Sequence, residues 1–166
     1  MTVAGLFRTL RRTCLVLVAV APLSGFSGAV WAQAVAAPPA AAGLVKRTTG
    51  TVSVVRAGVG QPVQPGLVVQ VGDTFRTGAD SGVALALADD TLLSIGSDSE
   101  VQVTGFTFDS TTEDGSLLAS VWRGTAAFVS GLIAKKAPDK VRVQTRTVVL
   151  GVRGTEFIVD AGRGAP

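Results

Sequence analysis

From Leu44 onward, the sequence alternates short runs of valine, leucine and threonine with glycine, aspartate and proline. Apolar residues recur at every second position in stretches such as GVALALADDTLLSIG and VRVQTRTVV. A period of two places alternate side chains on opposite faces of a strand, and Gly, Asp and Pro favour the turns between strands. No window has a convincing helical period. The pattern therefore predicts an all-β domain, either a β-solenoid-like roll or a sandwich of short strands.

Two features of this pattern predict local structure. Residues 82–96 are expected to form a hairpin whose larger apolar side chains share one face and whose chain turns at 88–91. Further along, the apolar positions change from odd to even between Val103 and Phe106. Gly105 lies at this change of parity, which predicts a β-bulge there.

The C-terminal third predicts strands separated by charged turns. Two strands are expected to meet at Arg123-Gly124, and the alternation over residues 141–149 predicts one half-buried strand. Residues 135–140, KKAPDK, predict an exposed charged loop. One turn of helix near 130–136 remains an alternative for the apolar run that precedes this loop.

The N-terminal segment has the organisation of an export signal. Three arginines lie within the first 12 residues, and the apolar run CLVLVAVAPL follows at 14–23. Small residues then offer cleavage after Ala32 or after Ala34. Pro, Ser and Gly interrupt the run before it reaches the length of about 20 apolar residues that a membrane span needs. We expect a cleavable signal at 1–34, an Ala/Pro-rich tether at 35–43 and one domain at 44–162.

Signal removal changes the charge and the chemistry of the chain. It removes three of the 15 basic residues and none of the 12 acidic ones, which leaves 12 of each. A neutral mature chain does not predict nucleic-acid binding. The segment also contains the single cysteine, and the whole chain has no histidine. A thiolate nucleophile, a Ser-His dyad, a thiolate zinc site and a disulfide are therefore not expected, and the sequence predicts neither a catalytic site nor a cofactor.

The order of the strand and turn motifs resembles the FecR domain family. The matching stretches are GTVSVVRAG, GLVVQVGDTFRTGADSGVALALADDTLLSIGSDSEVQV and VQTRTVVLGVRGTEFIV, and the closing GVRGTEF is the most specific of them. The sequence departs from the family at Asp89-Asp90-Thr91, where Asp-Gly-Ser is common. The resemblance implies a periplasmic all-β interaction domain. Its namesakes couple an outer-membrane siderophore transporter to a sigma factor through an anti-sigma region and a transmembrane helix, neither of which is recognisable here.

GVRGTEF has two interpretations that differ in function. A phosphate-binding loop would open a helix, whereas β-branched residues precede this motif and EFIVD follows it. The context favours a turn between strands, in which the two glycines allow a close approach or a positive φ. Arg153 could then bind a carboxylate within the fold, or it could contact a partner protein.

The acidic residues cluster in the middle third of the chain without a recognisable metal-binding spacing. The cluster comprises Asp73, Asp80, Asp89, Asp90, Asp98 and Glu100. Calcium sites need six to eight oxygen ligands, but no EF-hand or repeated calcium motif is present. Turn formation explains each aspartate separately, because its side chain can accept the N–H two residues further along. We therefore expect no metal site.

The basic loop that follows LIA is the best candidate contact surface. Lys135, Lys136 and Lys140, together with Arg153, are the residues that we expect to contact a partner. The sequence thus predicts a non-catalytic sensory or binding module in the cell envelope. It would be periplasmic or extracellular and would recognise an unidentified envelope protein, with strand addition at a sheet edge as one mode. The alternative is an envelope protein that binds polysaccharide or peptidoglycan.

Overall fold

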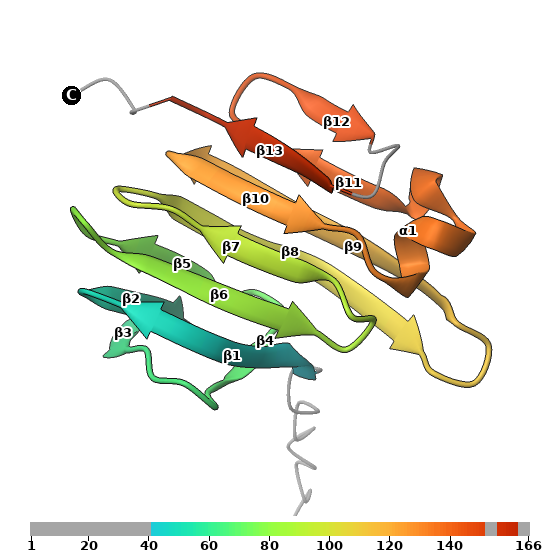
Figure 1. Cartoon of the computed structure of the whole chain (residues 1–166), viewed down its shortest axis with the longest axis horizontal. Coiled ribbons are helices and arrows are strands. Elements are labelled where there is room, and N and C mark those ends of the chain that lie inside the picture. The colour runs from blue at the N-terminus through green and yellow to red at the C-terminus, as the bar shows by residue number, and fades with distance from the viewer. Residues whose placement is uncertain (1–40, 152–155, 163–166) are drawn as a thin grey trace, which may run out of the picture. The chain divides into compact units, whose positions relative to one another are not determined.

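A computed structural model of the chain describes residues 41–151 and 156–162, in which thirteen strands form two sheets (Figure 1). The strands of the six-stranded sheet are, in spatial order, β13 (Glu156–Asp160), β10 (Thr125–Val129), β7 (Leu92–Ile95), β6 (Gly82–Leu87), β1 (Ala41–Thr49) and β4 (Val68–Gln70). Those of the seven-stranded sheet are β12 (Val149–Gly151), β11 (Val141–Gln144), β9 (Asp114–Arg123), β8 (Glu100–Asp109), β5 (Thr74–Thr77), β2 (Val52–Arg56) and β3 (Val59–Pro62).

The two sheets enclose a single apolar core. Alternate residues of β6, β7 and β10 point inward from one sheet, and those of β5, β8 and β9 point inward from the other. The largest buried side chains include Phe75 and Phe128, which come from opposite sheets. The expected all-β domain is thus confirmed, and of the two architectures left open it is the sandwich that forms.

The 82–96 hairpin and the bulge at Gly105 are confirmed. β6 and β7 pair antiparallel, with Leu85 opposite Leu93. β8 and β9 pair over nearly their whole length, but the register shifts between Val103 and Gly105. This bulge lets Val103 and Phe106 both face the core although they lie three residues apart.

The strand expected over residues 141–149 is wrong in its second half. β11 ends at Gln144, and the chain then turns back so that β12 pairs antiparallel with β11. The Thr145 backbone N–H donates to the Val148 carbonyl (2.8 Å), and the Thr145 hydroxyl accepts the Val148 N–H (3.2 Å). A threonine that forms both bonds makes a turn, which the period-two pattern alone does not reveal.

Two other boundaries also differ from expectation. β1 begins at Ala41, so the last three residues of the tether proposed for 35–43 belong to a strand, and Ala42 is fully buried. Residues 135–140 are not a simple loop, and the alternative of one helical turn near 130–136 is confirmed. The short helix α1 (Leu132–Lys136) contains Lys135 and Lys136, and the 3₁₀ helix η1 (Pro138–Lys140) follows it.

The β6–β7 turn holds α1 in position. The Leu132 N–H donates to the Asp89 carbonyl (2.7 Å), and the Gly131 N–H donates to the Thr91 hydroxyl (3.1 Å). A Cβ atom at Gly131 would lie 2.1 Å from the Asp89 carbonyl oxygen, so only glycine allows this approach. Ile133 of α1 is then buried, which contributes about 1.5–3 kcal/mol.

β9 and β11 form a parallel pair, whereas the other strand pairs in the described residues are antiparallel. A parallel pair requires a long connection. Here β10 and the two short helices α1 and η1 provide it. The same connection brings η1 close to β9 and β11, where the candidate site lies. Across residues 41–151 and 156–162, we find no helix with the length and apolarity of a membrane span.

Candidate functional site

Asp73 is a buried carboxylate whose partners belong to the fold. Both of its oxygens accept hydrogen bonds from Arg56, each at 2.7 Å, and one of them also accepts the Gln70 N–H. The hydrogen bond to Asp73 raises the pKa of Arg56 and outweighs partial burial, which lowers it. Arg56 also donates to the Val68 carbonyl (2.8 Å) and thereby links β2 to β4. Asp73 therefore holds the two sheets together rather than facing a ligand.

The Asp89 carboxylate is likewise bound by groups of its own turn. Its carboxylate accepts the Thr91 N–H (3.2 Å) and the Thr91 hydroxyl (2.7 Å), and its side chain is fully buried. Asp90 is exposed and has a φ of 65°. The two neighbouring carboxylates thus differ completely in their access to solvent, which does not fit a pair acting together on a glycosidic bond. Among the described residues, no group of three or more metal-ligating side chains is arranged around a common point.

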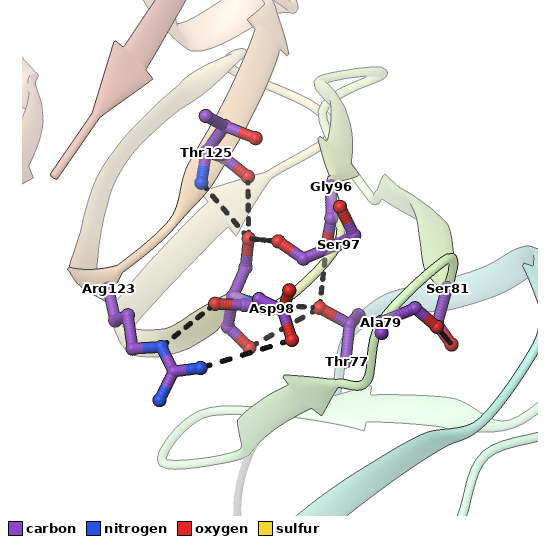
Figure 2. Close-up of polar contacts among 9 residues, drawn as sticks. Thr77, Ala79, Ser81, Gly96, Ser97, Asp98, Arg123 and Thr125 are labelled. Carbon is purple, nitrogen blue, oxygen red and sulfur yellow. Dashed lines mark hydrogen bonds and ion pairs between the residues drawn. The ribbon is translucent and has the colours of Figure 1, made fainter. Parts of the chain in front are cut away.

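A polar network joins the sheets at one end of the sandwich (Figure 2). The Thr77 hydroxyl donates to the Gly96 carbonyl (2.6 Å) and accepts the Ser99 N–H (2.9 Å). The Ser99 hydroxyl accepts the Thr125 N–H (3.0 Å) and donates to the Ser97 carbonyl (2.9 Å). These bonds satisfy backbone groups where the chain crosses between the sheets. We assign this network a structural role.

The other end of the network reaches the surface. The Arg123 Nε–H donates to the Asp98 carbonyl (3.1 Å), and the guanidinium lies 3.9 Å from the Asp98 carboxylate (Figure 2). Both side chains are more than one-third exposed, so this ion pair contributes little to stability. In the described part of the chain, no buried side-chain nitrogen or oxygen lacks a hydrogen-bond partner.

The predicted lysines cluster only in part. Lys136 and Lys140 converge on Asp114 at the start of β9, with Nζ–Oδ1 distances of 3.4 and 3.8 Å. Lys136 also donates to the Thr112 carbonyl. Lys135 lies on the same helix and is exposed, with no ion pair inside the described residues. Arg153, the fourth predicted contact, lies outside the described residues.

A groove of about 490 Å³ lies beside this cluster, on the outer surface of the seven-stranded sheet. β9 provides Leu118, β12 provides Val149, and both are apolar. η1 provides Lys140 and β11 provides Arg142, which place two cations at the groove, while Asp139 adds one carboxylate. The volume is in the range of sites that hold small molecules or peptide side chains. Its combination of an apolar surface and cations suits a segment that carries both apolar and acidic side chains.

Strand β12 borders this groove and lies at the edge of its sheet. It pairs with β11 on one side and has no neighbour on the other within the described residues. All three of its residues are exposed, including Val149 (59%) and Leu150 (39%). An apolar edge strand offers unpaired backbone N–H and C=O groups to an incoming strand. The groove and the edge together form one continuous candidate surface, which we name the β12 site: Leu118, Lys140, Arg142 and Val149–Gly151.

Sequence reasoning identified one member of this site and missed another. Lys140 was predicted as a partner contact, whereas Arg142 belongs to the stretch 141–149, for which the sequence predicts only a half-buried strand. Arg142 is exposed and, inside the described part of the chain, has no ion pair or side-chain hydrogen bond. Its position two residues after Lys140 was visible in the sequence. The turn that returns β12 to the side of Arg142 was not.

The chain was compared with known families and structures. The family model described as FecR protein matches residues 73–165, which is more than half of the 166 residues. A solved structure described as "Cell surface anchoring domain" shares 31% sequence identity, covers 38% of this chain and 84% of its own, and has a TM-score of 0.37. No curated protein matches the chain. The match to the family model extends from Asp73 through β13, and this chain belongs to the FecR protein family.

Proposed function

We propose that this chain is an exported, non-catalytic binding module of the cell envelope that recognises a protein partner through the β12 site. The observation that carries the proposal is Arg142, a cation that has no ion pair with any described residue and that lies in a partly apolar groove next to an exposed edge strand. Membership of the FecR family agrees with a role in the envelope.

The chemistry of the β12 site suggests what the partner presents. An extended segment can pair with the free edge of β12 through its backbone, and every second side chain then points to the same face. On the groove side, a carboxylate could bind the guanidinium of Arg142 with two hydrogen bonds. An apolar neighbour would contact Leu118 and Val149. We therefore propose an extended protein segment with alternating acidic and apolar residues.

A non-catalytic role is supported by the hydrogen bonds that the buried carboxylates already accept within the fold. Asp73 and Asp89 are fully buried, and each is bound by residues of its own fold. A general acid or base must be able to reach the substrate. Exposed Asp90 has no second carboxylate turned toward it from the same turn. We propose that the domain acts by binding.

The direct test is partner capture by matched arginine variants. The tagged protein is expressed from its full coding sequence in the cells that naturally produce it, and the bound proteins are identified by mass spectrometry. Arg142→Glu should reduce capture of the specific partner at least tenfold, because the new carboxylate repels an acidic segment. Arg146→Glu makes the same change in the exposed 145–148 turn outside the groove and should capture normally.

Two further results bear on this test. Equal capture by the parent and Arg142→Glu would refute the β12 site. Binding of the parent to purified peptidoglycan, with loss in Arg142→Glu, would favour the alternative of an envelope polymer ligand. Among the lining residues of the groove, none is aromatic, so it lacks a ring face for stacking on sugars.

N-terminal sequencing should find Gln33 or Val35 first in the exported protein, and a retained Arg8 would refute cleavage.

A further inference from the structure

The outer face of the six-stranded sheet differs in charge between its middle and its two sides. Its three central strands, β6 (GVALAL), β7 (LLSI) and β10 (TAAFV), contain no charged residue. An ordinary solvent-exposed sheet face carries polar and charged side chains. The middle of this face is instead made of small or apolar side chains.

Large apolar side chains form a row across this face. Val68 pairs with Leu44, Leu44 with Ala86, Ala86 with Leu92 and Leu92 with Val129, so the row crosses five neighbouring strands. The four larger members are each 40–45% exposed. A contiguous apolar surface of this kind is typical of an interaction site.

The charges on the two sides of the row have opposite signs. Lys46 and Arg47 are exposed on β1, whereas Glu156 and Asp160 are exposed on β13. Within the described residues, neither cation has an ion pair with another part of the chain. The face therefore runs from a basic strand through an uncharged centre to an acidic strand.

The same two sides also differ in shape. Leu44, Val68 and Ala86 line a hollow of about 410 Å³ on the β1 side. On the β13 side, Ile158 projects from the face and is 72% exposed, the highest value among the large apolar residues described. One side of the face thus has an apolar hollow and the other an apolar projection.

We propose that a second copy of this chain docks on this face, with a two-fold axis that runs parallel to the strands near β7. Such a rotation places β13 of each copy over β1 of the other. The acidic strand then meets the basic strand twice, and the register places Ile158 of each copy at the level of Arg47 in the other, next to the hollow. A self-complementary pattern is what an isologous two-fold interface requires.

The size of the face limits the surface area that the contact can bury. Six strands spaced about 4.8 Å apart span less than about 30 Å, and stacked sheets pack about 10 Å apart. An interface of this size belongs with small, transient protein contacts rather than with obligate dimers. We therefore expect a reversible dimer whose population increases with protein concentration and decreases with salt.

Sedimentation equilibrium of the protein expressed from its full coding sequence tests the dimer. Leu92→Asp places a carboxylate next to the axis in both copies and should weaken association at least tenfold. Val59→Asp is the control, because Val59 is 69% exposed on β3 of the other sheet, and it should associate like the parent. A parent that stays monomeric up to about millimolar concentration, or two variants with equal effects, would overturn the proposal.

A mixing experiment tests the orientation. The acidic variant Lys46→Glu/Arg47→Glu carries acidic residues on both β1 and β13. The basic variant Glu156→Lys/Asp160→Asn carries no acidic residue on β1 or β13. Its second change retains a side-chain oxygen that can accept the Gly162 N–H. Each variant alone should associate more weakly than the parent, and their equimolar mixture should form heterodimers. Failure of the mixture to recover association would contradict the proposed two-fold arrangement.

Discussion

At the scale of single residues, the aspartates of the turn motifs have a structural role, because their buried carboxylates accept hydrogen bonds from the surrounding chain. Asp73 follows Gly72 and accepts three hydrogen bonds, while Asp89 begins the β6–β7 turn. Asp90 has a φ of 65°, which lies in the left-handed region that favours glycine. Aspartate tolerates this conformation better than most residues, which explains how the turn survives without glycine.

The sequence could predict these aspartates but not all of their partners. A turn role for Asp73 and Asp89 follows from local spacing, because an aspartate commonly bonds the backbone two or three residues away. The pairing of Asp73 with Arg56 spans 17 residues and depends on how β2 and β4 meet. Nothing in the local pattern indicates a contact at that distance in the chain.

The Arg56–Asp73 pair should be a major contributor to stability. Arg56→Ala would leave the fully buried Asp73 carboxylate with little compensation, at a cost of about 2–4 kcal/mol. Arg76→Ala is the matched control, because its ion pair with Glu100 is exposed on both sides and should matter by less than about 1 kcal/mol. Urea unfolding measures both. Equal midpoints for the two variants would contradict the role of the buried pair.

At the scale of elements, the sequence predicted strands and turns best where the apolar alternation, or its change of parity, was clear. The 82–96 hairpin and the Gly105 bulge follow directly from the period and its change of parity. The same rule failed over residues 141–149. Thr145, Thr147 and Val149 continue the period-two spacing of a strand, but Thr145 forms the hydrogen bonds of a turn with Val148. This failure concealed β12, and with it half of the candidate site.

Thr145 should determine whether β12 stays paired. Thr145→Val removes the hydroxyl that accepts the Val148 N–H and should open the β11–β12 hairpin locally, at a cost of about 1 kcal/mol. Hydrogen exchange of the Val149–Gly151 amides should then become about fivefold faster, with little change in the core strands. Thr145→Ser retains the hydroxyl and should exchange like the parent. Unchanged exchange in Thr145→Val would show that the hydroxyl does not hold the turn.

At the scale of the whole molecule, the described fold presents two surfaces of different chemistry. The β12 site combines an edge strand with two cations, of which Arg142 has no ion pair with a described residue. The outer face of the six-stranded sheet is self-complementary in charge. The fold class and the family could be predicted from the sequence. The surfaces could not, because each brings together strands from distant parts of the chain.

These two surfaces should be separable by experiment. Leu92→Asp changes the six-stranded sheet, whereas Arg142→Glu changes the β12 site on the other sheet. We expect Leu92→Asp to abolish self-association while it retains partner capture, and Arg142→Glu to do the reverse. Loss of both properties in either variant, with an unchanged melting temperature, would show that the two surfaces are coupled.

The most direct test of the central claim is the footprint of the captured partner, measured by hydrogen exchange of the complex and of the free protein. We predict slower exchange at the Val149–Gly151 amides and at Arg142–Gln144, because an added strand would protect the free edge and the groove. The Arg142→Glu variant, mixed with the same partner, should show no such protection. Protection confined to the outer face of the six-stranded sheet, or no change at β12, would contradict recognition through the β12 site.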